Sequence, residues 1–218
     1  MNTKNSTSSK STKRRIAVGV SGSGRSLENL IAVSTSTNSS YEVVAVVASR
    51  SDIRGCEIAR NNNLPLLVLS FTKNNSDATA VKLYQWLGDQ KVDFVALAGF
   101  LKPFPVHPSW QDRVINIHPA LLPKYGGKGM YGHFVHEAVV AAGDLQSGAS
   151  VHFVNSKYDD GKVIGQVVVR LSNESTPETV AATVFPAECD LYPKVLEALC
   201  NGTLTKSSEV LRYFYEPK

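Results

Sequence analysis

The sequence predicts an α/β fold in which helices cover both faces of a mostly parallel central sheet, with an antiparallel extension towards the C-terminus. Two strand-like runs, Tyr41–Ala48 and Val92–Ala98, are almost continuously apolar, as expected for strands buried on both faces. Helical patterns separate them, which favours parallel crossover connections. The short gap between the runs Ala149–Asn155 and Val163–Leu171 instead indicates an antiparallel pair.

The first half of the chain alternates strands and helices without an internal repeat or a linker. In the third expected helix, Asp77–Asp89, the apolar residues Val81, Tyr84 and Leu87 recur at helical spacing. Strands are expected at Arg15–Val20, Tyr41–Ala48, Leu66–Leu69, Val92–Ala98 and Val114–Ile117, and helices from Ser26 through Ile31, around Cys56–Asn62 and over Asp77–Asp89.

The second half begins with a helix predicted over His133–Ala142, which ends at a glycine. After the antiparallel pair, Thr176-Pro177 is a favourable helix start, because proline is well tolerated at the first helical position. That last helix should run towards Asn201. Pro186 lies inside it and is expected to kink or split it.

Composition is ordinary for a globular protein: 218 residues, of which 43% are hydrophobic. No apolar run approaches the roughly 18 residues of a membrane span, and the N-terminus has no secretory pattern, so no membrane partner is expected. Three widely spaced cysteines, Cys56, Cys189 and Cys200, fit reduced thiols in a cytoplasmic protein better than disulfides or a zinc site. Nothing in the sequence specifies an oligomeric state.

The net charge of +4 comes from the N-terminal segment. Removing its five basic residues from the total of 23 leaves 18 against 19 acidic residues, so the remaining body is nearly neutral and nucleic-acid binding is not expected. Residues 1–14 are mostly Ser, Thr, Lys and Asn, which predicts a disordered basic tail ahead of a single domain over residues 15–218.

The segment Val114–Pro123 carries the first candidate site residues. It starts as a buried strand and then places Asn116 and His118 where the strand should end. Residues two apart on a strand share a face, and ligands of open α/β sheets bind at the carboxyl ends of strands. An amide that donates to an oxyanion and an imidazole that moves a proton would suit catalysis there. A buried Asn–His pair that closes a loop is the alternative.

A glycine-rich turn, Gly22–Ser26, follows the first strand and opens a helix, an arrangement that can cradle a phosphate. It is a partial dinucleotide fingerprint, with Leu27 where the third glycine belongs. It is also a near miss for a nucleophile elbow, because Ser23 replaces the last glycine. A purely structural tight turn remains open.

The second acidic candidate lies in Asp159-Asp160-Gly161, between two expected strands. This tripeptide is a natural turn. If one carboxylate faced His118, it would raise the pKa of the imidazole. Spacing alone does not choose between the two interpretations.

Three motifs together resemble the formyltransferases that use 10-formyltetrahydrofolate, especially those that formylate phosphoribosylglycinamide in purine synthesis. The motifs are Asn116-Ile117-His118-Pro119, Leu121-Leu122-Pro123, and Val151-His152-Phe153-Val154 ahead of Asp159. The resemblance extends from Arg15 to about Gly202, and the loop Gly126–Gly132 resembles a subgroup of these enzymes. It implies a Rossmann-like formyltransferase fold with a phosphate-binding amino-terminal half and a folate cleft beside the fifth strand. It also implies a cis peptide bond at Leu122-Pro123.

The resemblance implies acyl transfer and assigns roles to three residues. Asn116 would bind the formyl oxygen, and His118 would stabilise that oxygen and protonate the leaving folate nitrogen. Asp159 would keep His118 charged and order a water molecule for proton transfer, with Asp160 ranked second. His152 is predicted to be structural, and His107, His133 and His136 have no matched role. No metal is expected.

The resemblance also divides the substrate contacts into two groups. The acceptor phosphate and ribose would meet Gly24, Arg25, Ser26 and Glu188, although Phe185, Pro186 and Cys189 depart from the family pattern. A basic residue for the folate tail falls in the Lys73–Asp77 region, with Lys73 as the candidate. The co-substrate 10-formyltetrahydrofolate would meet Leu101, Lys102, Pro103, Phe104, Val114, Asn116, Asn155, Ser156, Lys157 and Tyr158.

Other functions were weighed. Methionyl-tRNA formyltransferase and formyltetrahydrofolate hydrolase carry additional domains for which this chain leaves no room. A nucleotide-binding oxidoreductase is favoured by Gly22, Gly24 and the Ser49-Arg50 pair after the second strand, but it leaves the Asn116, His118 and Asp159 set unexplained. A non-catalytic folate-binding protein is a third hypothesis.

Overall fold

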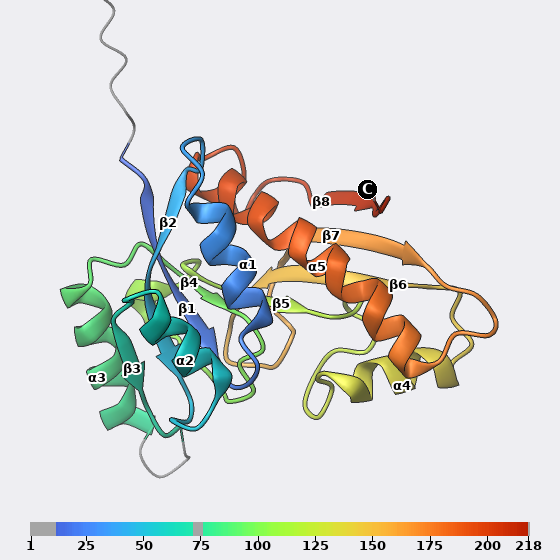
Figure 1. Cartoon of the computed structure of the whole chain (residues 1–218), viewed down its shortest axis with the longest axis horizontal. Helices are drawn as coiled ribbons and strands as arrows, with labels where there is room; N and C mark the ends of the chain where they lie inside the picture. Colours follow the sequence, from blue (N-terminus) through green and yellow to red (C-terminus); the bar gives the residue numbers. More distant parts are fainter. Residues whose placement is uncertain (1–11, 72–75, 218) are drawn as a thin grey trace, which may run out of the picture.

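The computed structural model describes residues 12–71 and 76–217 (Figure 1). Its helices are α1 (Arg25–Ser34), α2 (Arg54–Asn61), α3 (Ser76–Asp89), α4 (His133–Ala141) and α5 (Pro177–Cys200), with a short 3-10 helix at Pro108–Trp110. Its strands are β1 (Arg14–Val20), β2 (Tyr41–Ala48), β3 (Leu66–Val68), β4 (Phe94–Leu97), β5 (Val114–His118), β6 (Gln146–Phe153), β7 (Val163–Arg170) and β8 (Leu211–Phe214).

The strands described form one sheet in the order β3-β2-β1-β4-β5-β6-β7-β8. Strands β1 to β5 are parallel to one another, and β6 runs antiparallel to both β5 and β7. Strand β8 pairs parallel to β7. The expected parallel half and antiparallel extension are therefore confirmed, and β5 lies at the seam between them.

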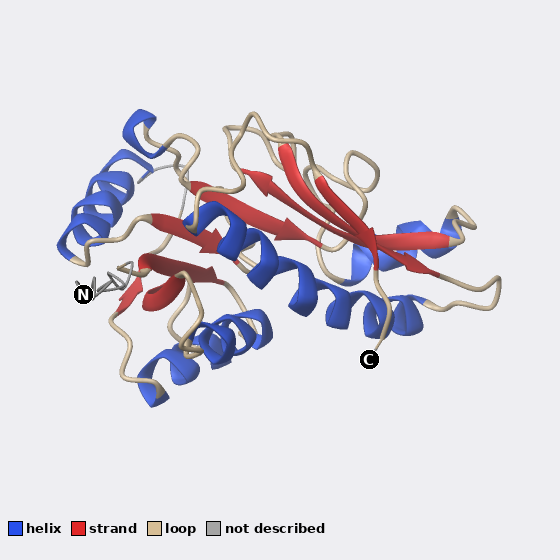
Figure 2. Cartoon of the chain, turned by 90° about the horizontal axis from the view of Figure 1, so that it is seen from above, coloured by secondary structure: helices blue, strands red, loops and turns tan. Residues whose placement is uncertain are grey.

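Helices cover both faces of this sheet (Figures 1 and 2). One hydrophobic cluster joins side chains of α1, α2 and α5 to the face that carries Ile16 and Ile115. The other joins α3 and the 3-10 helix to the opposite face, through Leu83, Leu87 and Trp110. The continuous apolar strands have both faces buried, which explains the lack of alternation in their sequences.

The long helix α5 binds the two halves together. Its Tyr192 is 1% exposed, and the hydroxyl donates to the backbone oxygen of Leu97 in β4 at 3.0 Å. The same hydroxyl lies 3.4 Å from the backbone oxygen of Ile115 in β5. Through Tyr192, α5 therefore holds β4 and β5 side by side.

Four expectations about single elements were wrong. Helix α5 runs through Pro186 as one element, so the predicted split does not occur, and the fully buried Val184 and Ala187 hold it on the sheet; the predicted kink stays a prediction. On α3, Val81 is 67% exposed, and the buried stripe instead contains Leu83 and Leu87, four residues apart on one face. Val114 is buried inside the sheet and does not reach the cavity described below.

The fourth concerns the tail. Strand β1 begins at Arg14, and the Lys13 ammonium donates to the backbone oxygens of Ser34 and Ser36 at 2.9 and 2.7 Å. Both residues are therefore part of the fold. The rest of the predicted tail up to residue 11, and Lys73, lie outside the described residues.

Other features agree with the sequence. The Leu122-Pro123 bond is cis, and the three cysteines are free thiols. Helix α5 is capped by Thr176, whose side chain accepts from the Thr179 N–H. Among residues 12–71 and 76–217, no helix combines the length and apolar character needed to cross a bilayer.

Candidate active site

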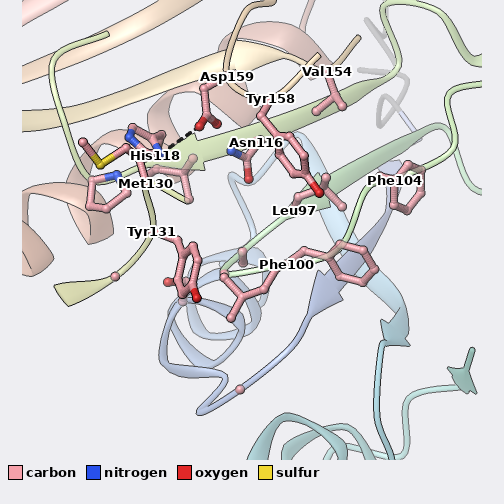
Figure 3. Close-up of a pocket in the computed structure, with 18 of the residues that line it drawn as sticks. Leu97, Phe100, Phe104, Asn116, His118, Met130, Tyr131, Val154, Tyr158 and Asp159 are labelled. Carbon is pink, nitrogen blue, oxygen red and sulfur yellow. Dashed lines mark ion pairs between the residues drawn. The ribbon is translucent and has the colours of Figure 1, made fainter. Parts of the chain in front are cut away.

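A cavity of about 630 Å³ opens at the carboxyl ends of β4 and β5, where ligands of open α/β sheets bind (Figure 3). It lies between the turn before α1, the glycine-rich loop before α4, and α5. Its lining includes the residues assigned above to catalysis, to the acceptor and, apart from Val114 and Lys73, to the co-substrate: Gly24, Arg25, Ser26, Leu101, Lys102, Pro103, Phe104, Asn116, His118, Asn155, Ser156, Lys157, Tyr158, Asp159 and Glu188.

Strand β5 presents Asn116 and His118 on the face that the period of the strand predicts. Ile115, which precedes Asn116 on the strand, is fully buried in the hydrophobic cluster on the other face. The imidazole of His118 is also buried, and its Nε2 lies 2.7 Å from the Tyr125 backbone oxygen. A carbonyl only accepts, so Nε2 carries a proton and Nδ1 is the nitrogen left for proton transfer.

The third residue, Asp159, approaches from the loop between β6 and β7. Its Oδ2 lies 3.6 Å from His118 Nδ1 and accepts a 2.9 Å hydrogen bond from the Gly127 N–H. Asp159 has a φ of 52°, in the left-handed region that Asp tolerates better than most residues. A Cβ on Gly126 would fall 2.5 Å from Leu122 Cδ2 and 3.2 Å from Asp159 Cβ. A side chain at this position would therefore displace the Leu122 side chain and press on Asp159.

The charge state of His118 differs from the expectation. Burial lowers the pKa of His118 and outweighs the nearby Asp159 carboxylate, which acts to raise it. The net pKa lies below the ordinary value, which favours a neutral imidazole at pH 7. For Asp159, burial acts to raise the pKa. The His152 ring 3.4 Å away, the nearby His118 and the hydrogen bond from the Gly127 N–H together lower it below the ordinary value.

Sequence reasoning missed the place of His152, which it took as structural. His152 faces Asn116 directly across the antiparallel β5–β6 pair, and its Nε2 lies 3.1 Å from Asn116 Nδ2 and 3.4 Å from Asp159 Oδ1. Its Nδ1 lies 2.9 Å from the Phe153 backbone oxygen and therefore carries a proton. The other ring nitrogen, Nε2, then accepts from Asn116 and leaves the second amide hydrogen of Asn116 free for a ligand.

His136, on α4, was also left without a role. It is 6% exposed and lines the cavity, and its Nδ1 is buried with no hydrogen-bond partner among the described residues. Burial, followed by the nearby His133 and His118, lowers its pKa. Its position as the fourth residue of α4, after a glycine-rich loop, gave no sequence signal.

One end of the cavity is suited to an anion. Gly24, at a φ of 72°, caps α1 without a side-chain cap, so the first backbone N–H groups of the helix face the cavity end where Ser26 lies. A Cβ on Gly24 would fall 2.9 Å from the Gly55 Cα, which excludes other residues from this turn. Glu188 lies across from it on α5, and burial raises its pKa to about 7 against the opposing effect of Arg25.

The other end is apolar and aromatic. Leu101 is 49% exposed, and its backbone N–H is held by the Ser21 hydroxyl at 3.0 Å. Phe104 packs edge-on against Phe100, with ring centroids 5.7 Å apart. A flat heterocycle between this segment and the Asn155–Tyr158 loop would find apolar faces together with backbone hydrogen-bonding groups. In the described part, no cluster of three His, Cys, Asp or Glu residues could hold a metal ion.

Asp160, the alternative carboxylate, does not face this cavity. It accepts from the Asn155 amide at 3.2 Å and lines a separate, smaller pocket. The geometry therefore favours Asp159 as the residue that acts with His118.

Comparisons with known proteins agree with this site. Residues 14–196 match the family described as formyl transferase. The chain is 40% identical over 193 residues to a phosphoribosylglycinamide formyltransferase, chloroplastic, of Arabidopsis thaliana, and 38% identical over 192 residues to that of Vigna unguiculata. The matches cover 87% of this chain but only 66% and 62% of those proteins, so the chain spans less than two thirds of each relative.

A solved structure gives the same result. The phosphoribosylglycinamide formyltransferase of Anaplasma phagocytophilum superposes with a TM-score of 0.79 and 27% identity, covering 94% of this chain and 100% of that one.

Proposed function

This chain belongs to the formyl transferase family, and from that membership we propose that it transfers a formyl group from 10-formyltetrahydrofolate to the amine of phosphoribosylglycinamide in purine biosynthesis. The observation that carries the proposal is the convergence of Asn116, His118 and Asp159 on one cavity that has an anion-binding end and an aromatic end. These ends suit the acceptor phosphate and the pterin of the co-substrate.

In the proposed reaction the glycinamide nitrogen attacks the formyl carbon, and the carbonyl oxygen becomes an oxyanion. Asn116 donates its free amide hydrogen to that oxygen, held in orientation by His152. The former amine nitrogen, now positively charged, gives up a proton to neutral His118. The resulting imidazolium passes this proton to N10 of the folate as the carbon–nitrogen bond breaks.

Asp159 contributes during the step at which His118 is charged. Because the carboxylate lies 3.6 Å from Nδ1 in a largely water-excluded site, it stabilises the imidazolium as it forms. This replaces the expectation that Asp159 keeps His118 charged at rest. Each proton that leaves the amine arrives at N10, so the transfer requires no external acid.

The proposal is tested by mixing the protein with 10-formyltetrahydrofolate and phosphoribosylglycinamide and following the absorbance change of the folate. We expect formylated glycinamide ribonucleotide and tetrahydrofolate in equal amounts. Formate released without the acceptor would instead indicate a hydrolase. Oxidation of a nicotinamide cofactor without folate turnover would favour the oxidoreductase alternative.

Removal of residues 2–11 is expected to leave kcat and KM unchanged, because the cavity is lined by residues between Gly22 and Glu188. The deletion must stop before Lys13, since this side chain binds two carbonyl groups at the end of α1. Steady-state kinetics of the truncated protein provide the check. A large loss of turnover in a folded truncation would contradict this prediction. The expected cytoplasmic location stays a prediction, and the two plant relatives are named as chloroplastic.

A further inference from the structure

We propose that Arg25 and Phe185 form an anion clamp that makes this chain select an acceptor bearing a phosphomonoester, with Phe185 as the positioning residue for Arg25. This inference rests on the proposed function, because it assigns the group that distinguishes phosphorylated from unphosphorylated acceptors. Both residues line the cavity, Arg25 from the first position of α1 and Phe185 from the middle of α5.

The contact between the two side chains is face-on. The Arg25 Cζ atom lies over the Phe185 ring, 3.8 Å from its centroid. A guanidinium held by its face keeps its N–H donors available along its edges, where they match the geometry of phosphate oxygens. The ring therefore fixes the cation without consuming a donor.

The donors of Arg25 are unused within the described residues, where no hydrogen bond or ion pair engages them. Two other arginines of this half are paired with carboxylates: Arg15 with Glu42 at 2.8 Å and Arg54 with Glu28 at 2.7 Å. Arg25 is exposed at the cavity, so its donors are open to an anionic ligand that binds there.

Glu188 is the carboxylate that would otherwise neutralise Arg25. It lies one helical turn after Phe185 on α5, and the charge of Arg25 acts to lower its pKa. The two make no ion pair within 4 Å in the described part, because Arg25 stacks on the ring instead. Burial keeps the pKa of Glu188 at about 7 although Arg25 acts to lower it.

The two helices are held together independently of the clamp. The Asn29 amide on α1 donates to the Cys189 backbone oxygen on α5 at 2.8 Å. This contact fixes the start of α1, where Arg25 lies between Gly24 and Ser26. The backbone N–H groups of α1 and the guanidinium group can there bind the same phosphate.

The test compares KM and kcat for phosphoribosylglycinamide and for its dephosphorylated riboside in four proteins: the parent, Arg25→Ser, Phe185→Leu and the double variant. Loss of a charge-assisted contact should raise KM for the phosphorylated acceptor roughly 10- to 100-fold with kcat little changed, and leave KM for the riboside unaltered. Phe185→Leu should raise KM for the phosphorylated acceptor roughly 3- to 10-fold. In the Arg25→Ser background, the same substitution should cause no further rise in this KM. Phe214→Leu, which removes a similar pair with Arg170 at 5.6 Å on β8, is the matched control and should change neither constant.

Calorimetry with inorganic phosphate separates this inference from the proposed function. If formyl transfer is absent but phosphate binding weakens in Arg25→Ser and Phe185→Leu, the clamp stands and the proposed reaction fails. If Phe185→Leu weakens both acceptors equally, or weakens them as much without Arg25 as with it, Phe185 is only a packing residue and the clamp is refuted. An Arg25→Ser protein that still prefers the phosphorylated acceptor to the parental degree also refutes it.

Discussion

Replacing Asp159 by Asn is expected to lower kcat/KM by roughly 10²-fold, by analogy with the loss of an electrostatic catalytic group. The amide keeps the shape and can still accept from the Gly127 N–H, and Asn tolerates the left-handed φ of 52° at this position. What is lost is the negative charge 3.6 Å from His118 Nδ1, so the imidazolium formed during proton transfer is no longer stabilised.

The pH dependence of this variant has a definite sign. The Asp159 carboxylate acts to raise the pKa of His118, so its removal lowers that pKa further. The reaction begins with neutral His118, and activity is therefore lost as the pH falls through the His118 pKa. The acid limb of the kcat/KM profile should move to lower pH in the variant, and NMR titration of the His118 ring should show the same displacement.

Asp160→Asn is the matched control, because Asp160 lines the separate smaller pocket. It should retain nearly the parental rate and profile. A dead Asp160→Asn beside an active Asp159→Asn would show that the assignment within the pair is reversed. If neither substitution affects the rate, the segment is a turn and nothing more.

The second large effect is expected for Asn116→Ala, with a loss of roughly 10²- to 10³-fold in kcat, typical of removing an oxyanion donor. Asn116 supplies the amide hydrogen that His152 leaves free. Because the phosphate-binding turn and α5 lie at the other end of the cavity, the Kd for phosphoribosylglycinamide should stay within about threefold, as expected for an interaction made only in the transition state.

Single-turnover kinetics and calorimetry of the same preparation check this prediction. The thermal unfolding of Asn116→Ala should remain cooperative, which controls for damage to β5. A variant whose only defect is weaker acceptor binding would contradict the role of Asn116 as an oxyanion donor.

The sequence predicted those parts of the site that depend on local periodicity. Asn116 and His118 share a face because they are two apart on one strand, and this face could be deduced without any neighbour. The contribution of His152 could not, because it depends on the cross-strand register that sets it opposite Asn116. In the same way, the lowered pKa of His118 follows from burial by the surrounding loops, a property that no local pattern encodes.

The fold shows the same division. The continuous apolar runs predicted the parallel half, and the short gap before Val163 predicted the antiparallel pair. Strand β8 was not predicted, because Leu211–Phe214 mixes exposed apolar and basic residues at a sheet edge and has no periodic signal. Pro186 led to the prediction of a split helix. The split does not occur, since the lost backbone hydrogen bond at proline is outweighed by the burial of the α5 face on either side of it.

The contact of Tyr192 with β4 and β5 affects how the chain folds during its synthesis. Tyr192 is synthesised 77 residues after its partner Ile115, so both strands leave the ribosome well before the helix that covers them. Until then the apolar face that contains Ile115 is exposed, and the nascent chain is a natural client for chaperones that hold unfolded chains. Stalled chains that end before Pro177 should be cleaved readily within β4 and β5 by a protease, whereas chains released after Cys200 should resist it.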